Sequence, residues 1–94
     1  MRILKQLSSV GNTLTLKDIV TNIVFYKIII TKDQAFSNNV YLIKQKEVKS
    51  IFICNLKDVN DDLEVAFCGL KAEDNDLYWI RHEDLTKLPI INRM

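Results

Sequence analysis

The sequence predicts a single domain, residues 1–94, that is mainly β with a minor helical part. Two observations predict this class: short β-branched and aromatic runs recur along the chain, and the polar connections between them are only four to seven residues long. Parallel strands need crossovers of roughly a dozen residues, so neighbouring runs are expected to pair antiparallel. The predicted architecture is a small antiparallel sheet of five to six strands, either an open meander or a closed small barrel.

The composition supports a globular domain. Hydrophobic residues make up 48% of the chain and charged residues 27%, and there are only two Gly and one Pro, which excludes a disordered or low-complexity sequence. The first residues lack the apolar stretch of a signal peptide, and no segment reaches the roughly 20 apolar residues that span a bilayer. We therefore expect a cytoplasmic protein that does not associate with a membrane.

Five runs are predicted to be strands. They are residues 24–31, 39–45, 50–56, 63–70 and 77–82. The third run is apolar on both faces at residues 51–54, which predicts a central strand covered on both sides or a strand of a closed barrel. The fourth run alternates, so that Leu63, Val65 and Phe67 form its core face.

The N-terminal third allows two interpretations. Its apolar residues follow helical spacing at Leu16, Ile19, Val20, Ile23 and Val24. Thr15 with Asp18 three residues later resembles a capping box, so we predict a short helix near residues 15–23 that leads into the first strand. The alternative is a strand at residues 13–20, and residues 2–8 are expected to add an edge strand.

The C-terminal part predicts one helical turn near residues 83–88, which Pro89 ends. The turn directly follows the strand that bears Trp79. A tryptophan-bearing strand followed by such a turn resembles the close of an SH3-like small barrel, over about twelve residues. The resemblance implies that the sheet closes into a barrel.

No constellation typical of an enzyme is found. His82 is the only histidine, and Cys54 and Cys68 lack the Cys-x-x-Cys spacing of zinc sites. Both cysteines lie within apolar runs and are expected to be reduced core thiols. We therefore expect neither catalytic residues nor a bound metal or cofactor, and the protein is not expected to be an enzyme.

One short motif resembles a calcium loop but lacks its essential residues. Asp58, Asn60 and Asp62 match the first three ligand positions. Leu63 stands where the loop needs Gly, and Gly69 stands where it needs a bidentate glutamate. The segment is therefore interpreted as a polar turn.

Aromatic and basic residues provide the candidates for binding a partner. Tyr78 and Trp79 are adjacent in a predicted strand and point to opposite faces, so one of them is expected to be partly exposed. Charge is also segregated along the chain. Residues 1–57 contain nine Lys/Arg and three Asp/Glu, whereas residues 58–94 contain four Lys/Arg and nine Asp/Glu. The predicted partner-binding residues are Tyr41, Lys44, Lys46, Lys49, Tyr78, Trp79 and Arg81.

The charge segregation itself has two interpretations. In an antiparallel meander, the basic segment 44–49 and the acidic segment 73–76 lie at the same end, where they would form exposed ion pairs. Alternatively, the two-signed surface steers a partner or a second copy of the chain.

The expected function is a small non-catalytic protein-interaction module, a regulator or inhibitor of a larger protein. Frequent Ile, Lys and Asn suggest an AT-rich genome, so a host-modulating protein of a phage or mobile element would fit. The alternative is a nucleic-acid-binding small barrel that uses the basic N-terminal part, although a net charge of +1 argues against it. Homodimerisation through the apolar segment 28–30 is a further expectation.

Overall fold

The computed structural model describes residues 1–91 of the chain. The strands are β1 (Leu4–Val10), β2 (Thr13–Asp18), β3 (Val24–Gln34), β4 (Val40–Ile43), β5 (Lys46–Asp58), β6 (Glu64–Ala72), β7 (Leu77–Arg81) and β8 (Ile90–Ile91). A 3-10 helix, η1 (His82–Lys87), connects β7 to β8. The protein is thus mainly β, as the sequence predicts, and the expected helical turn near residues 83–88 is confirmed.

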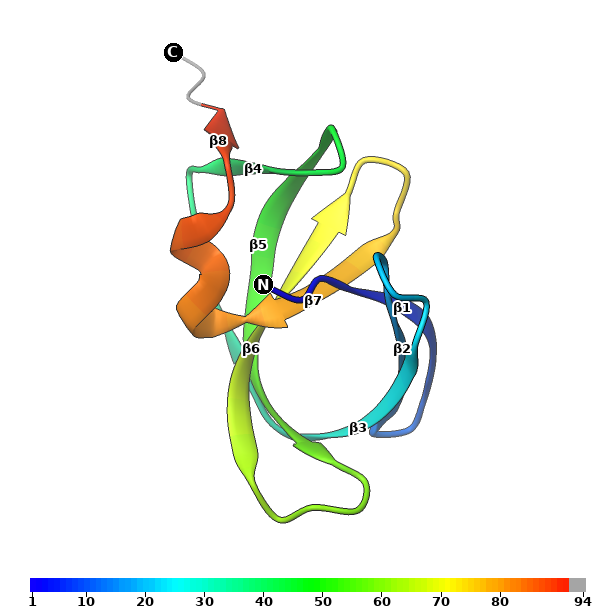
Figure 1. Ribbon diagram of the computed structural model, residues 1–94. Helices are drawn as coiled ribbons and strands as arrows, with labels where there is room; N and C mark the ends of the chain where they lie inside the picture. Colours follow the sequence, from blue (N-terminus) through cyan, green and yellow to red (C-terminus); the bar gives the residue numbers. More distant parts are fainter. Residues whose placement is uncertain (92–94) are drawn as a thin grey trace.

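Six of the strands close into a barrel. They pair antiparallel in the order β1, β2, β3, β5, β6 and β7, and β7 returns to β1 through the pairs Leu4–Trp79 and Lys5–Tyr78. Figure 1 shows the ring that these strands form. Register shifts in β3 between Ile29 and Thr31, and in β5 between Ser50 and Phe52, mark the bulges that help strands bend into a closed sheet.

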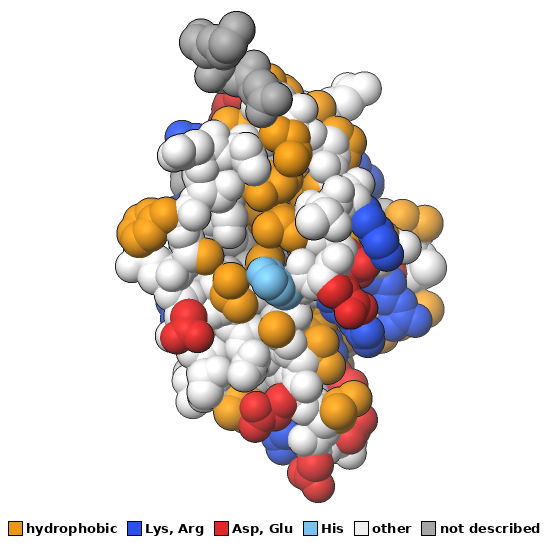
Figure 2. Space-filling view, turned by 90° about the vertical axis from the view of Figure 1, so that its left-hand side faces the viewer, with side chains coloured by type: hydrophobic (Ala, Val, Ile, Leu, Met, Phe, Trp, Pro, Cys, Tyr) orange, Lys and Arg blue, Asp and Glu red, His pale blue; other side chains and the backbone are white. Residues whose placement is uncertain are grey.

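A second layer covers the outside of β5, β6 and β7. The short strand β4 pairs with the beginning of β5 and with β8, and η1 packs beside β6 and β7 (Figure 1). On the side of the molecule that carries η1 and β8, hydrophobic side chains form a band that extends from the single histidine towards the C-terminal end (Figure 2). The three middle strands are therefore covered on both faces.

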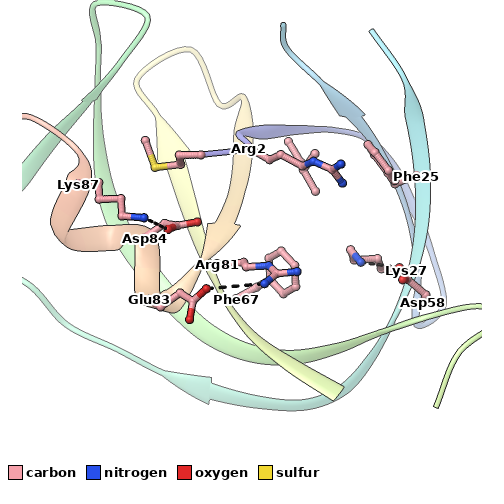
Figure 3. A pocket seen from close by; sticks show the side chains of 11 residues that line it. Arg2, Phe25, Lys27, Asp58, Phe67, Arg81, Glu83, Asp84 and Lys87 are labelled. Atoms are coloured by element: carbon pink, nitrogen blue, oxygen red, sulfur yellow. Dashed lines mark hydrogen bonds and ion pairs between the residues drawn. The ribbon is translucent and has the colours of Figure 1, made fainter. Parts of the chain in front are cut away.

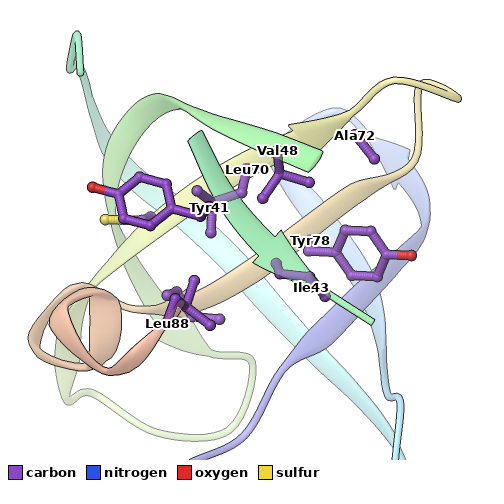
Figure 4. Close-up of a cluster of buried hydrophobic side chains, with 9 residues drawn as sticks. Tyr41, Ile43, Val48, Leu70, Ala72, Tyr78 and Leu88 are labelled. Carbon is purple, nitrogen blue, oxygen red and sulfur yellow. The ribbon is translucent and has the colours of Figure 1, made fainter. Parts of the chain in front are cut away.

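This double cover produces two separate cores. The inner core fills the barrel and contains Leu4, Leu14, Leu16, Cys54, Leu56, Phe67 and Trp79. The outer core lies beneath β4 and η1 and contains Tyr41, Ile43, Val48, Cys68, Leu70, Ala72, Tyr78, Ile80 and Leu88 (Figure 4). Side chains alternate between the two cores along β6 and β7, because successive residues of a strand point to opposite faces.

A glycine makes room for the aromatic contact between Phe52 and Trp79 in the inner core. A Cβ atom at Gly69 would lie 2.7 Å from Cε2 of Phe52, far inside van der Waals contact. With no side chain there, the Phe52 ring lies across Gly69 and reaches Trp79, at 5.1 Å between ring centroids. The indole N–H of Trp79 donates to Oε1 of Gln6 at 2.8 Å, which satisfies the buried polar atom of the ring.

The predicted helix at residues 15–23 is wrong, and the alternative strand is present as β2. Leu14 and Leu16 both point into the barrel, so the local period is that of a strand. Asp18 does not cap a helix; its carboxylate ends the strand by accepting the backbone N–H groups of Val20 and Thr21. These two hydrogen bonds hold the pKa of Asp18 below its ordinary value.

Two expected pairings also differ. Residues 2–8 were expected to form an edge strand, but β1 lies between β2 and β7. Residues 24–31 were expected to pair with residues 39–45, but β3 pairs with β5 instead, because β4 folds back onto the start of β5. The expectation of a third strand covered on both faces is confirmed by β5, because Phe52 and Cys54 pack in the inner core and Ile53 packs against the outer core.

In the part of the chain that the structure describes, no helix has the length and apolar character needed to cross a membrane.

Candidate functional site

The three aromatic residues predicted to bind a partner are buried. Tyr41 is 5% exposed, Tyr78 3% and Trp79 1%. The expectation that Tyr78 or Trp79 would be exposed is wrong, because both faces of β7 are covered: Trp79 faces the barrel interior and Tyr78 the outer layer. Figure 4 shows Tyr41 and Tyr78 at opposite margins of the outer core.

The four predicted basic residues do not form one surface. Lys44 lies in the β4–β5 turn and its ammonium group donates to the carbonyl of Ile19 at 3.3 Å. Lys49 is exposed on β5, and Arg81 is exposed at the far end of β7. The structure therefore separates Arg81 from the lysines.

Lys46 is held in an ion-pair cluster. Its ammonium group lies 2.7 Å from Asp74 and 3.1 Å from Asp76, and Asp76 also pairs with Lys5 at 3.4 Å. The hydrogen bonds to the two carboxylates raise the pKa of Lys46 and lower that of Asp74. The ion pairs expected between the basic and acidic segments are thus confirmed here.

A different charged site lies at the open end of the barrel near the start of β1 (Figure 3). This pocket, which we call the mouth, has a volume of about 500 Å³. Its basic side chains are Arg2, Lys27, Arg81 and Lys87, and its acidic side chains are Asp58, Glu83 and Asp84. The rings of Phe25 and Phe67 also line it.

Two of the cations lie over these rings. Lys27 lies on β3 between Phe25 and Ile29, and all three side chains are on the face that points into the barrel. The side chain of Lys27 is only 13% exposed. Its Nζ atom lies 5.2 Å from the centroid of Phe67 and bonds to Asp58. The guanidinium carbon of Arg2 lies 5.2 Å from the centroid of Phe25. Cation–π contacts of this kind keep positive charge at the rim of the inner core.

The other two cations of the mouth, Arg81 and Lys87, form ion pairs with acidic residues of η1. Arg81 lies 3.6 Å from Glu83, and both side chains are largely exposed. Lys87 donates to Asp84 at 2.9 Å, and this hydrogen bond raises the pKa of Lys87. Figure 3 shows Arg2, Lys27 and Arg81 reaching into the opening from different elements.

An apolar hollow adjoins the mouth. It is lined by Val24, Tyr26 and Val59, all exposed, and it shares Phe25 and Asp58 with the mouth. A pocket with four basic and three acidic side chains and an exposed apolar surface therefore lie side by side at this end of the molecule.

The residue types that commonly bind metal ions do not gather at one place within residues 1–91. No three His, Cys, Asp or Glu side chains of this part are placed to hold a metal ion. His82 is exposed. Cys54 and Cys68 are free and buried, and burial raises the pKa of Cys68 to about 11, so the thiol stays protonated at neutral pH.

Arg2, Phe25, Lys27 and Phe67 were not among the predicted site residues. One signal for Lys27 was present in the sequence: it occupies the same face of a strand as Phe25 and Ile29, where an inward-facing charge is unusual. That signal indicates a site only once the barrel is known to close, because closure decides which face is the interior.

Comparisons of the chain with models of protein families, with curated proteins and with solved structures give no significant match. The geometry of the mouth and the hollow is therefore the basis on which a function is proposed.

Proposed function

We propose that this chain is a small non-catalytic protein-interaction module that docks on a larger protein through the mouth and the adjoining apolar hollow. The observation that carries the proposal is the juxtaposition of four basic side chains with an exposed tyrosine and exposed valines. Arginine and tyrosine are enriched in protein interfaces because they combine apolar contact area with hydrogen-bonding groups. A regulatory or inhibitory effect on the partner, and a cytoplasmic location, remain predictions.

Rigid support favours this surface for binding. Phe25, Lys27 and Phe67 are presented by the long barrel strands β3 and β6, and the inner core packs directly beneath them. Side chains held by strands lose less freedom on binding than side chains on flexible loops.

Affinity purification of three tagged proteins from the source cells, followed by quantitative mass spectrometry, tests the proposal. Arg81→Glu reverses a charge at the mouth, and Lys71→Glu reverses an exposed charge on β6 outside the mouth and the hollow. We expect a protein that is enriched by the wild type and by Lys71→Glu but lost with Arg81→Glu. Absence of any such protein, or equal enrichment by all three baits, would contradict the proposal; thermal melting verifies that both variants fold.

The alternative of nucleic-acid binding through the basic N-terminal part receives less support. Tyr41 offers no exposed ring for stacking a base, and Lys46 is already bound between two carboxylates. Oligonucleotide binding that weakens as salt is raised, and that is lost with Lys49→Glu, would favour this alternative.

Homodimerisation through residues 28–30 also receives less support than the sequence suggested. Ile28 pairs with Thr13 on one side and with Lys57 on the other, and Ile29 packs against the inner core. The central part of this segment is therefore not a free edge at which a second copy of the chain could pair.

A further inference from the structure

We propose that the mouth binds a single carboxylate, the side chain of an aspartate or glutamate of the partner protein, while the hollow takes an apolar side chain that follows it closely in the partner's sequence. This inference rests on the proposed docking function and specifies its chemistry. It defines the partner as an acidic segment with a neighbouring apolar residue.

The balance of charge in the mouth favours one added negative charge. Each carboxylate of the mouth already pairs with one cation: Asp58 with Lys27, Glu83 with Arg81 and Asp84 with Lys87. Arg2 is the basic side chain that remains, because its guanidinium forms no ion pair within residues 1–91, although its charge contributes to the lowered pKa of Asp18. A carboxylate brings the single charge that would compensate Arg2.

The setting of the cations strengthens their attraction for an anion. Lys27 is mostly shielded from water, whereas Arg2 is exposed, and the rings of Phe25 and Phe67 replace solvent on one side of the two cations. Charges attract more strongly where the local dielectric constant is lower than that of water. The Arg81–Glu83 pair is long and exposed, so Arg81 can exchange its contact for an incoming carboxylate at little cost.

The hollow determines the orientation in which the partner's segment binds. Its apolar wall is formed by Val24, Tyr26 and Val59, and its rim carries Asp61 as well as the shared Asp58. Asp61 repels an acidic group from the hollow, whereas Arg2 attracts it to the mouth. Because the two sites share walls, residues one or two positions apart in an extended peptide, which rises about 3.3 Å per residue, would reach both.

Titration of the ¹⁵N-labelled protein with short peptides tests the inference. The probe is acetyl-Gly-Glu-Leu-Gly-amide, with two matched controls in which Gln replaces Glu or Ser replaces Leu. We expect the Glu-Leu probe to shift the amide signals of Arg2, Lys27 and Arg81 together with those of Val24 and Tyr26. Each control peptide is expected to bind at least about fivefold more weakly, and binding of the probe is expected to weaken as salt is raised.

Protein variants locate the binding group. Arg2→Met keeps the aliphatic stem but removes the charge, and is expected to weaken binding of the Glu-Leu probe about tenfold, the effect of losing a hydrogen bond to a charged group. Lys71→Met removes a charge outside both sites and is expected to leave binding unchanged. The ¹⁵N spectrum of each free variant shows whether the fold is kept.

Several results would overturn the inference. These are equal binding of the Glu and Gln peptides, shifts confined to other surfaces, and unchanged affinity in Arg2→Met with the fold intact. Tighter binding of inorganic phosphate than of the Glu-Leu probe would also overturn it, since the mouth would then be a phosphate site. Capture of a partner that depends on Arg81, without binding of the Glu-Leu probe, would refute the carboxylate while leaving docking through the mouth in place.

Discussion

The inner and outer cores share strands β5, β6 and β7 but are enclosed in different ways. The inner core lies within a closed ring of six strands, in which backbone hydrogen bonds connect every neighbour. The outer core is covered by β4, η1 and β8, which have only four, six and two residues. Short elements contribute few backbone hydrogen bonds, so the outer layer depends on the burial of its own side chains.

The borders of the two cores differ as well. Cations close the inner core, with Lys27 over Phe67 and, further along β3, Lys32 over Phe52 at 4.4 Å. Tyrosines border the outer core, and Figure 4 shows the Tyr41 and Tyr78 hydroxyls at its margins. The outer core has a charged border too, since Lys46 lies 5.8 Å from the centroid of the Tyr78 ring, but there the cation is held between Asp74 and Asp76. At the barrel, Arg2 lies over Phe25 beside the mouth without a paired carboxylate in the described residues, and this is where we expect binding.

The largest effect is expected from Trp79→Ala, which removes the largest side chain of the inner core. We expect a loss of about 3–5 kcal/mol in the free energy of unfolding, because the closed ring cannot collapse around the cavity. Urea denaturation followed by circular dichroism measures this loss. Trp79→Phe keeps a ring but leaves Gln6 without the indole N–H, and we expect it to reduce the free energy of unfolding by less than Trp79→Ala does. An equal reduction in both variants would show that the hydrogen bond, and not the packing, makes the larger contribution.

A smaller and more local effect is expected from Leu88→Ala in the outer core. We expect the free energy of unfolding to fall by about 2 kcal/mol, because the short covering elements can move into part of the cavity that the lost side chain leaves. The amide of Leu42 donates to the carbonyl of Pro89 at 2.9 Å, so its hydrogen exchange reports on the attachment of the outer layer. Exchange at Leu42 should accelerate far more than exchange within β2. Uniform acceleration of exchange across the molecule would contradict a separate outer layer. Thr86→Ala changes an exposed residue of the same turn, and as the control it is expected to leave exchange at Leu42 unchanged.

The smallest effect is expected at the ion-pair cluster, in Asp74→Asn. The pKa of Asp74 is lower in the folded protein than its ordinary value, so its ionised form stabilises the fold at neutral pH. That contribution disappears as the pH falls through the lowered pKa. We therefore expect Asp74→Asn to reduce Tm slightly at pH 7, and the difference from the wild type to shrink below a pH of about 4. A Tm difference for Asp74→Asn that is constant with pH would contradict the prediction.

The sequence predicted the strands well and the site poorly, for related reasons. Alternation of side chains along residues 63–70 and 77–82 is a local property, and it indicated β6 and β7. One residue of the predicted core face is wrong: Leu63 lies before the start of β6 and is 67% exposed, whereas Val65 and Phe67 do pack in the inner core. The alternation also placed Tyr78 and Trp79 on opposite faces, yet both are buried because a second layer covers the outer face. Exposure depends on what packs against each face, and this is not a local property.

The N-terminal segment illustrates the same limit. Apolar residues between Leu14 and Val24 satisfy both a helical and an extended period, and a single segment offers little to choose between them. The neighbours β1 and β3 decide the matter, because they supply the backbone partners that make β2 a strand.

The sequence by itself determined the β class, the antiparallel pairing of β6 with β5 and with β7, and the helical turn after Trp79. Each of these follows from a local period or from connections too short for any other arrangement. Only the tertiary structure decided the closure of β7 onto β1 and of β3 onto β5, which pairs strands far apart in the sequence. That closure turns one face of β3 into a barrel interior, and so brings Arg2, Lys27 and Arg81 together at the mouth.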